Sequence, residues 1–179
     1  MYLAAIKRFL GAVLRPLIFF TAAGAIFAAD GVRPEESAPD QAIPFDQLRK
    51  DAEQGNDKAE YLLGCCYNGD HGFPVDSAEA ARWWGKAAAK GLADAQFCIG
   101  LAYSLGQGVP KDAAVASKWW RMAAEQDHAE AQYFLGLSYC AGLGVTKSPA
   151  LAISWLSRSA KNGNRAALEV LRKLGSSPS

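Results

Sequence analysis

The chain has 179 residues, half of them hydrophobic, and a formal net charge of +1 at pH 7. This length and composition suit one domain with a continuous apolar core. The charge is nearly neutral and includes no basic run, which argues against a nucleic-acid-binding protein. Three positive charges, on Lys7, Arg8 and Arg15, precede the first acidic residue, Asp30, and without them the net charge is −2.

The first 29 residues predict a secretory signal. A basic stretch comes first, the apolar run 16–28 follows, and small residues mark the end. Cleavage after Ala25, Ala28 or Ala29 fits this pattern equally well. The alternative is an uncleaved anchor, although the apolar run is short and interrupted for a membrane span. We therefore expect a periplasmic or secreted protein that has no membrane association once the signal is removed.

Residues 30–44 hold three prolines and four acidic residues and predict a flexible linker. The folded domain is expected to begin with a partial unit at residues 45–58. A shift of 36 residues aligns its Leu48 with Trp84, a position in the second helix of the next unit. This partial unit is expected to cap the N-terminal end of the domain.

Three segments of 36 residues follow, at 59–94, 95–130 and 131–166, and they align without a gap. A fixed period in this range indicates a stacked-repeat architecture. The shared columns include Ala59, Ala95 and Ala131; Leu63, Ile99 and Leu135; Gly64, Gly100 and Gly136; Tyr67, Tyr103 and Tyr139; and Trp83, Trp119 and Trp155.

Each unit is predicted to form two helices. The Ala, Leu or Ile, and Tyr columns recur at i, i+4 and i+8, which places them on one stripe of the first helix. The glycine after the Leu column would let a second helix approach closely. Second helices are expected to begin after Asp76, Asp112 or Ser148, all good N-cap residues. They are expected to end at Gly91 and Gly163, with a weaker cap at Asp127 in the second unit.

The tryptophans of the second helices are predicted to be core residues. They form the pairs Trp83–Trp84 and Trp119–Trp120. Burial of one such ring contributes about 1.5–3 kcal/mol or more. The second position of the pair becomes Leu156 in the third unit, which also favours packing over the alternative, a ligand platform.

These columns resemble the Sel-1-like repeat, a relative of the tetratricopeptide repeat, over residues 45–174. The pattern that carries the resemblance is A-x-x-x-L-G-x-x-Y, a Gly-Val turn, and A-x-x-W-x-x-x-A-A-x-x-G. It implies an all-α protein, a right-handed α/α superhelix (solenoid) of stacked antiparallel helix pairs. This sequence departs from the pattern at Asp70, Phe73, Asp127 and Ser148, which affects local turns.

The last predicted helix spans residues 165–174 and begins like the first helix of a fourth unit. Leu168, Leu171 and Leu174 are expected on its apolar face, so that residues 167–174 form a C-terminal cap. Residues 175–179 predict a short disordered tail.

Four cysteines follow the linker, at Cys65, Cys66, Cys98 and Cys140, and they occupy four different repeat columns. Small buried hydrophobes are the favoured interpretation, and one disulfide between neighbouring units is the alternative. The two histidines, His71 and His128, are expected to be exposed loop residues.

No catalytic or metal-binding pattern is recognised. There is no Cys-x-x-Cys, no His pair at i, i+4 and no Ser-x-x-Lys, and Asp76 and Asp112 are expected to be helix caps. We therefore predict no metal, no cofactor and no enzymatic activity. The alternative function is a cell-wall or β-lactam-related hydrolase, which the resemblance to cysteine-rich members of the family suggests.

The predicted binding site is the side of the first helices opposite the Ala, Leu and Tyr columns. The resemblance implies that first helices line the concave face of the stack, where a protein or peptide would bind. The alternative is that these side chains pack against the neighbouring first helix. A monomeric or weakly associating adaptor is expected. The site residues are Tyr61, Cys65, Asn68, Phe97, Leu101, Ser104, Leu105, Tyr133 and Leu137.

Overall fold

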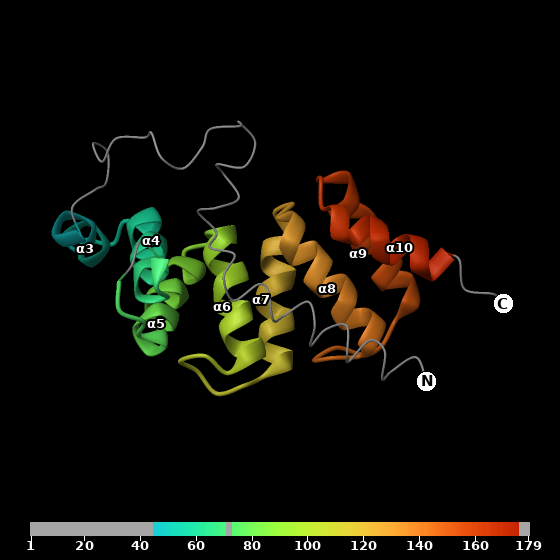
Figure 1. Ribbon diagram of the computed structural model, residues 1–179, viewed down its shortest axis with the longest axis horizontal. Helices are drawn as coiled ribbons and strands as arrows, with labels where there is room; N and C mark the ends of the chain where they lie inside the picture. Colours follow the sequence, from blue (N-terminus) through green and yellow to red (C-terminus); the bar gives the residue numbers. More distant parts are fainter. Residues whose placement is uncertain (1–44, 71–72, 176–179) are drawn as a thin grey trace.

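The computed structural model describes residues 45–70 and 73–175 (Figure 1). The predicted signal, the linker, His71 and residues 176–179 lie outside this part of the chain. The described part folds into eight α-helices and contains no strand, which confirms the all-α prediction. The helices are α3 (Phe45–Glu53), α4 (Asp57–Tyr67), α5 (Ser77–Ala89), α6 (Ala93–Leu105), α7 (Ala113–Glu125), α8 (Ala129–Ala141), α9 (Pro149–Lys161) and α10 (Arg165–Gly175).

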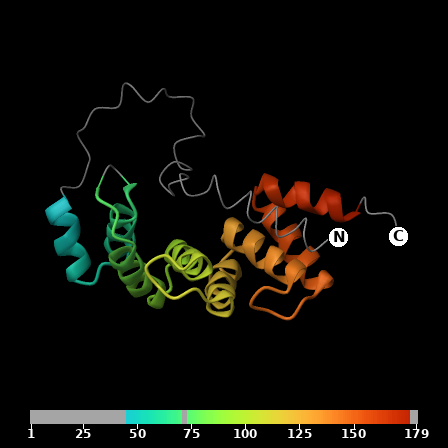
Figure 2. The same ribbon diagram turned by 60° about the horizontal axis from the view of Figure 1, so that its bottom comes forward.

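The helices pack as successive pairs. Within the units, α4 packs on α5, α6 on α7, and α8 on α9. Neighbouring units meet where α5 packs on α6 and α7 on α8, and the single helices α3 and α10 pack on α4 and α9 at the two ends. The pairs follow one another in chain order along a shallow arc (Figure 2). The described helices therefore form a stack in which the main contacts of each unit are with its neighbours.

A glycine in each first helix sets the close approach of the two helices within a unit. A Cβ atom added at Gly64 would lie 2.5 Å from Cδ1 of Trp84, and one at Gly100 would lie 2.5 Å from Nε1 of Trp120. The third unit repeats the contact with Leu156, whose Cγ would lie 2.8 Å from a Cβ at residue 136. This confirms that the glycine column allows a close approach of the second helix.

Two turn glycines fix the step from one unit to the next. Gly108 and Gly144 have φ values of 69°. A Cβ at Gly108 would lie 1.9 Å from the carbonyl oxygen of Ser77, and one at Gly144 would lie 2.0 Å from that of Ala113. Each turn therefore rests directly on the backbone at the start of the preceding unit's second helix.

The predicted caps of the second helices are confirmed. Asp76 accepts hydrogen bonds from the Ala78 and Glu79 amides, and the side chains of Asp112 and Ser148 cap α7 and α9. At the end of α7, Asp127 takes a left-handed conformation with φ of 63°, where the other units have glycine. Its carboxylate accepts a 2.8 Å hydrogen bond from Arg158, a contact that the sequence did not predict.

The first helices begin two residues before the leading alanine of each unit. Asn56 accepts a hydrogen bond from the Ala59 amide at the start of α4. Nδ1 of His128 accepts one from Ala131 at the start of α8, and Asn164 accepts one from Ala167 at the start of α10. These N-caps share one repeat column, in which Leu92 caps nothing at the start of α6, and they escaped the sequence analysis because they lie ahead of the conspicuous alanine column.

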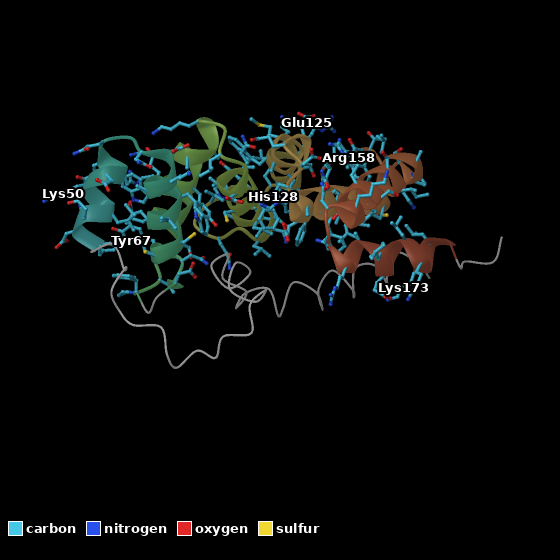
Figure 3. The ribbon with its side chains drawn as sticks, turned by 90° about the horizontal axis from the view of Figure 1, so that it is seen from above. Lys50, Tyr67, Glu125, His128, Arg158 and Lys173 are labelled. Atoms are coloured by element: carbon cyan, nitrogen blue, oxygen red, sulfur yellow. The ribbon has the colours of Figure 1, made fainter. Side chains whose placement is uncertain are left out.

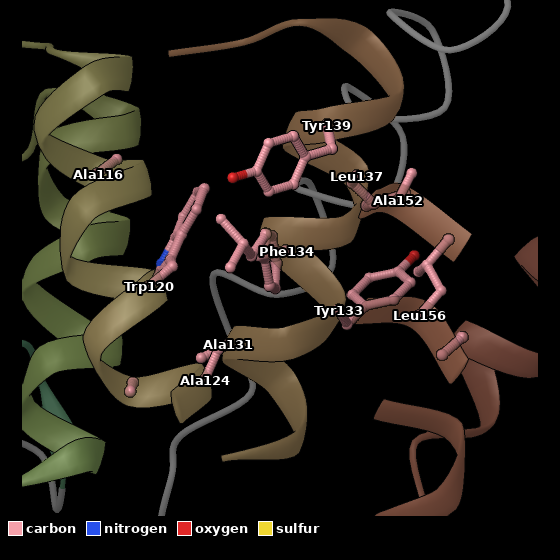
Figure 4. Close-up of a cluster of buried hydrophobic side chains, with 13 residues drawn as sticks. Ala116, Trp120, Ala124, Ala131, Tyr133, Phe134, Leu137, Tyr139, Ala152 and Leu156 are labelled. Atoms are coloured by element: carbon pink, nitrogen blue, oxygen red, sulfur yellow. The ribbon is translucent and has the colours of Figure 1, made fainter. Parts of the chain in front are cut away.

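Most of the predicted core is confirmed. Trp83, Trp84 and Trp120 are buried, whereas Trp119 and Trp155 are half-buried against the cores of their units. In the C-terminal cluster, Trp120 of α7 faces Phe134 of α8, with ring centroids 5.1 Å apart (Figure 4). In the Tyr column, Tyr139 is buried within the C-terminal cluster, and Tyr67 and Tyr103 are half-buried and each pack against two clusters.

A ladder of polar contacts also joins the units. Gln126 Nε2 donates to Oε1 of Gln96 at 2.8 Å and to the Gly91 carbonyl at 3.0 Å. Gln96, which is buried, donates in turn to the Ala88 carbonyl of the preceding unit. The next unit repeats these contacts with Asn162, Gln132, Asp127 and Ala124. In the first unit, Lys90 and Glu60 form the corresponding pair.

The two end helices differ in how well they cover the core. Leu48 and Ala52 of α3 are buried, as expected for a cap. In α10, Ala167 is buried and Leu171 and Leu174 are half-buried, but Leu168 is 53% exposed. The prediction that Leu168 belongs to the buried face is therefore wrong, because α10 packs on α9 through the side that carries Ala167.

Candidate functional surface

The nine predicted site residues fall into three classes of exposure. Asn68 is exposed. The half-buried residues are Tyr61, Phe97, Leu101, Ser104 and Leu105. The buried residues are Cys65, Tyr133 and Leu137. The exposed part of the predicted face therefore lies on α4 and α6, and α8 adds little to it.

The third unit shows why α8 adds little. Tyr133 lies beside Leu156 of α9, and its ring is 5.6 Å from that of Phe134 (Figure 4). Phe97 of α6 reaches the same cluster, because its ring lies 5.6 Å from that of Phe134. Phe97 thus packs against the neighbouring first helix, as the alternative interpretation of the sequence held, whereas the contacts of Tyr133 lie within its own unit.

Leu62 adds apolar surface that the sequence analysis missed. It lies on α4 next to Tyr61 and is 42% exposed. Its counterparts in the next two units, Cys98 and Phe134, are buried. The sequence carries no signal for this difference, because the column is apolar in all three units. Leu62 is thus exposed, whereas Tyr61 and Leu105 of the predicted face are half-buried.

His128 lies at the junction of α6 and α8 and not in an exposed loop, so that prediction is wrong. Its side chain is only 12% exposed, and its ring stacks on Phe97 at 4.9 Å. Nε2 lies 3.3 Å from Oδ1 of Asp94, and Nδ1 lies 3.5 Å from Oε2 of Glu130. Because Nδ1 accepts the Ala131 amide hydrogen, Nε2 carries the proton that faces Asp94. This hydrogen bond lowers the pKa of Asp94.

The cysteines behave as packing residues. Cys65, Cys66 and Cys98 are buried, Cys140 is half-buried, and all four are free thiols. Burial raises the pKa of Cys65 to about 12 and also raises the pKa of Cys98. Thiols with raised pKa values stay protonated at neutral pH and are poor nucleophiles. The favoured interpretation of the cysteines as small buried hydrophobes is confirmed for the three buried ones.

Neither a metal site nor a membrane-spanning helix is found in residues 45–70 and 73–175. Within these ranges no three His, Cys, Asp or Glu side chains come together as a metal site requires. None of the helices described there is long and apolar enough to cross a bilayer.

Solved structures with the same architecture come from several bacteria. A Sel1 repeat protein from Oxalobacter formigenes has a TM-score of 0.67 and 32% identity over 69% of this chain and 36% of its own length. A protective antigen of uropathogenic Escherichia coli strains, which displays an SLR fold, has a TM-score of 0.66 and 43% identity over 68% of this chain. The match covers 26% of that antigen, so the chain spans about a third or less of these two relatives.

A more distant structure shows the fold alone. The cysteine rich protein B of Helicobacter pylori has a TM-score of 0.58 and 20% identity, over 73% of this chain and 98% of that protein. No curated protein sequence matches the chain.

The family comparison agrees with the helix bounds. The model of the Sel1 repeat matches residues 57–92, 93–128 and 129–164, which begin where α4, α6 and α8 begin. The match covers more than half of the chain, and the architecture is a repeat scaffold consistent with protein–protein interaction. The described structure, with its stacked helix pairs and glycine contacts, has the organisation of that repeat. The chain belongs to the Sel1 repeat family.

Proposed function

We propose that the protein is an exported, non-catalytic scaffold that binds a protein or peptide segment across its first helices. The observation that carries this proposal is the apolar surface of Leu62 on α4, which is 42% exposed, together with the half-buried Tyr61 of α4 and Leu105 of α6. Exposed apolar patches on stacked repeats are typical partner-binding surfaces. The half-buried thiol of Cys140 and the buried cysteines offer no activated nucleophile to support a hydrolase.

Polar residues complete the proposed surface. Asn68 is exposed at the end of α4, and Ser104 is half-buried near the end of α6. Side chains of this kind supply hydrogen bonds at the rim of an apolar contact. The proposed partner segment therefore presents apolar side chains to α4 and α6 and polar groups to the ends of these helices.

Export rests on the composition of the first 29 residues, where a basic stretch precedes an apolar run and small residues. We propose that the folded stack acts in the periplasm or outside the cell. Fractionation of cells that express the full chain tests this directly. Recovery of the unprocessed chain from the cytosol would contradict export without affecting the binding surface.

The binding surface is tested by the double variant Leu62→Ser, Leu105→Ser, because neither side chain belongs to a described core cluster. We expect loss of in-cell cross-linking to the partner, with an unchanged melting temperature. The matched control is Leu151→Ser on α9, which is 44% exposed and lies outside the proposed surface. Equal cross-linking by all three proteins would contradict the proposal, as would a large loss of thermal stability in the double variant.

A further inference from the structure

The last helix, α10, takes the place of the first helix of a fourth unit. Ala167 is buried as Ala131 is one repeat earlier, and Leu171 aligns with Leu135. In each complete unit a second helix covers the neighbouring side of the first helix. Among the described residues no helix occupies that place beside α10, and Leu168 and Arg172 on this side are exposed.

Arg172 shows that this side does not accept an ordinary second helix. It stands in the column of Gly64, Gly100 and Gly136. In those units even a Cβ atom would lie within 2.8 Å of the second helix. An arginine side chain there excludes that close packing, and Arg172 is instead 83% exposed. Whatever covers α10 must lie further away and accommodate a guanidinium group.

Leu168 supplies an apolar centre to the uncovered side. The same column holds Glu60, Gln96 and Gln132, which are polar and buried in the ladder between units. At Leu168 the column becomes apolar, and the residue is 53% exposed. One hollow on α10 is lined by Arg165, Leu168, Glu169, Leu171 and Arg172. Such an exposed leucine between charged residues is typical of a contact surface.

The charge of this end indicates the chemistry of the partner. The helix α10 holds three basic side chains, Arg165, Arg172 and Lys173 (Figure 3), and a single acidic one, Glu169, whose Oε1 lies 3.4 Å from Nη1 of Arg172. A second copy of the same end would bring like charges together, which is unfavourable. An acidic segment is attracted, and arginine side chains pair well with carboxylates because the planar guanidinium can donate two parallel hydrogen bonds.

We propose that α10 docks an acidic amphipathic helix of another protein in place of a fourth second helix. Leu168 and Leu171 contact the apolar stripe of this helix, and Arg165 and Arg172 pair with the carboxylates beside the stripe. This surface lies at one end of the stack and is separate from the proposed surface on α4 and α6.

The test titrates the full chain into a labelled synthetic helical peptide that has leucines on one face and glutamates beside them, followed by fluorescence anisotropy. We expect saturable binding that weakens as ionic strength rises. Leu168→Glu and Arg172→Glu should each weaken binding by about tenfold or more. Met122→Glu on α7 is the matched control, because Met122 is 45% exposed and belongs to neither proposed surface. Circular dichroism checks that every variant keeps its helical content.

Three results would overturn the proposal. The first is equal binding of a peptide in which lysines replace the glutamates, since charge would then play no part. The second is unchanged binding by Leu168→Glu. The third is a dimer in sedimentation experiments that Leu168→Glu converts to a monomer, which would make a second copy the occupant. If the double variant Leu62→Ser, Leu105→Ser no longer binds the peptide while Leu168→Glu still does, the peptide binds to the α4 and α6 surface instead.

Discussion

The Lys90 ammonium donates a 2.8 Å hydrogen bond to Oε1 of Glu60, at the position where the next two units place a pair of uncharged amides. The other carboxylate oxygen, Oε2, is buried without a hydrogen-bond partner. In the next unit the corresponding atom is the amide nitrogen of Gln96, which donates to the Ala88 carbonyl. A shift of 36 residues makes the Ala52 carbonyl the corresponding acceptor for residue 60.

Glu60→Gln should therefore stabilise the protein. The new amide can donate a hydrogen bond to the Ala52 carbonyl, where Glu60 has a buried oxygen without a partner. The stability gained from this hydrogen bond should exceed the stability lost with the Lys90 ion pair, which is partly exposed. We expect the free energy of unfolding in urea to rise by about 1 kcal/mol. Glu53→Gln, in the exposed pair with Arg49, is the control and should change stability by less than about 0.5 kcal/mol. If Glu60→Gln is less stable than the wild type, the ion pair with Lys90 contributes more than the new hydrogen bond.

Gly100→Ala should destabilise the stack, because the added Cβ would lie 2.5 Å from Nε1 of Trp120. Overpacking of this kind costs about 1–3 kcal/mol. Gly85→Ala offers a contrast within α5, since nothing lies within 4 Å of a Cβ there. The alanine should raise stability by up to about 1 kcal/mol through helix propensity. Calorimetric melting temperatures that move in the same direction for both variants would refute the proposed contact.

His128→Asn separates the two roles of the histidine. Asparagine already caps α4 and α10 in the same column, so the cap of α8 should survive. The hydrogen bond that lowers the pKa of Asp94 should be lost. We expect the Asp94 pKa, followed by NMR of its carboxyl carbon, to rise toward the ordinary value.

The pH dependence of stability follows from the sign of this shift. A carboxyl group with a lowered folded-state pKa stabilises the fold above its unfolded pKa of about 4. That contribution disappears as the pH falls through the lower folded-state pKa. Wild type should therefore lose more stability than His128→Asn below about pH 4. Identical Asp94 titrations in the two proteins would contradict the assignment.

Asp127 combines a left-handed backbone with a carboxylate that contacts Arg158. Two substitutions at this position isolate the contribution of the backbone. Asp127→Ala and Asp127→Gly both remove the carboxylate, but only glycine adopts φ of 63° without strain. In urea denaturation the alanine variant should be less stable than the glycine variant by about 1 kcal/mol. Equal stabilities would mean that the backbone at this position is not left-handed in solution.

The sequence was sufficient to predict the stack, because the features that build it recur every 36 residues. The glycine contacts with Trp84 and Trp120 and the Asp76 and Asp112 caps all belong to such columns. Exposure could not be predicted in the same way. Leu62, Cys98 and Phe134 share one apolar column, but their exposure depends on neighbouring helices. Leu168 is exposed because α10 packs on α9 through another side, and no periodic pattern records that.

Gly108 and Gly144 have a consequence for how such an array can diversify. Each rests on the main chain of the unit before it, so this contact between units is made by backbone atoms and does not involve outward-pointing side chains. Substitutions at those outer positions can therefore alter what the protein recognises while the pitch of the array stays the same. Geometry and specificity are carried by different positions of the same 36-residue period.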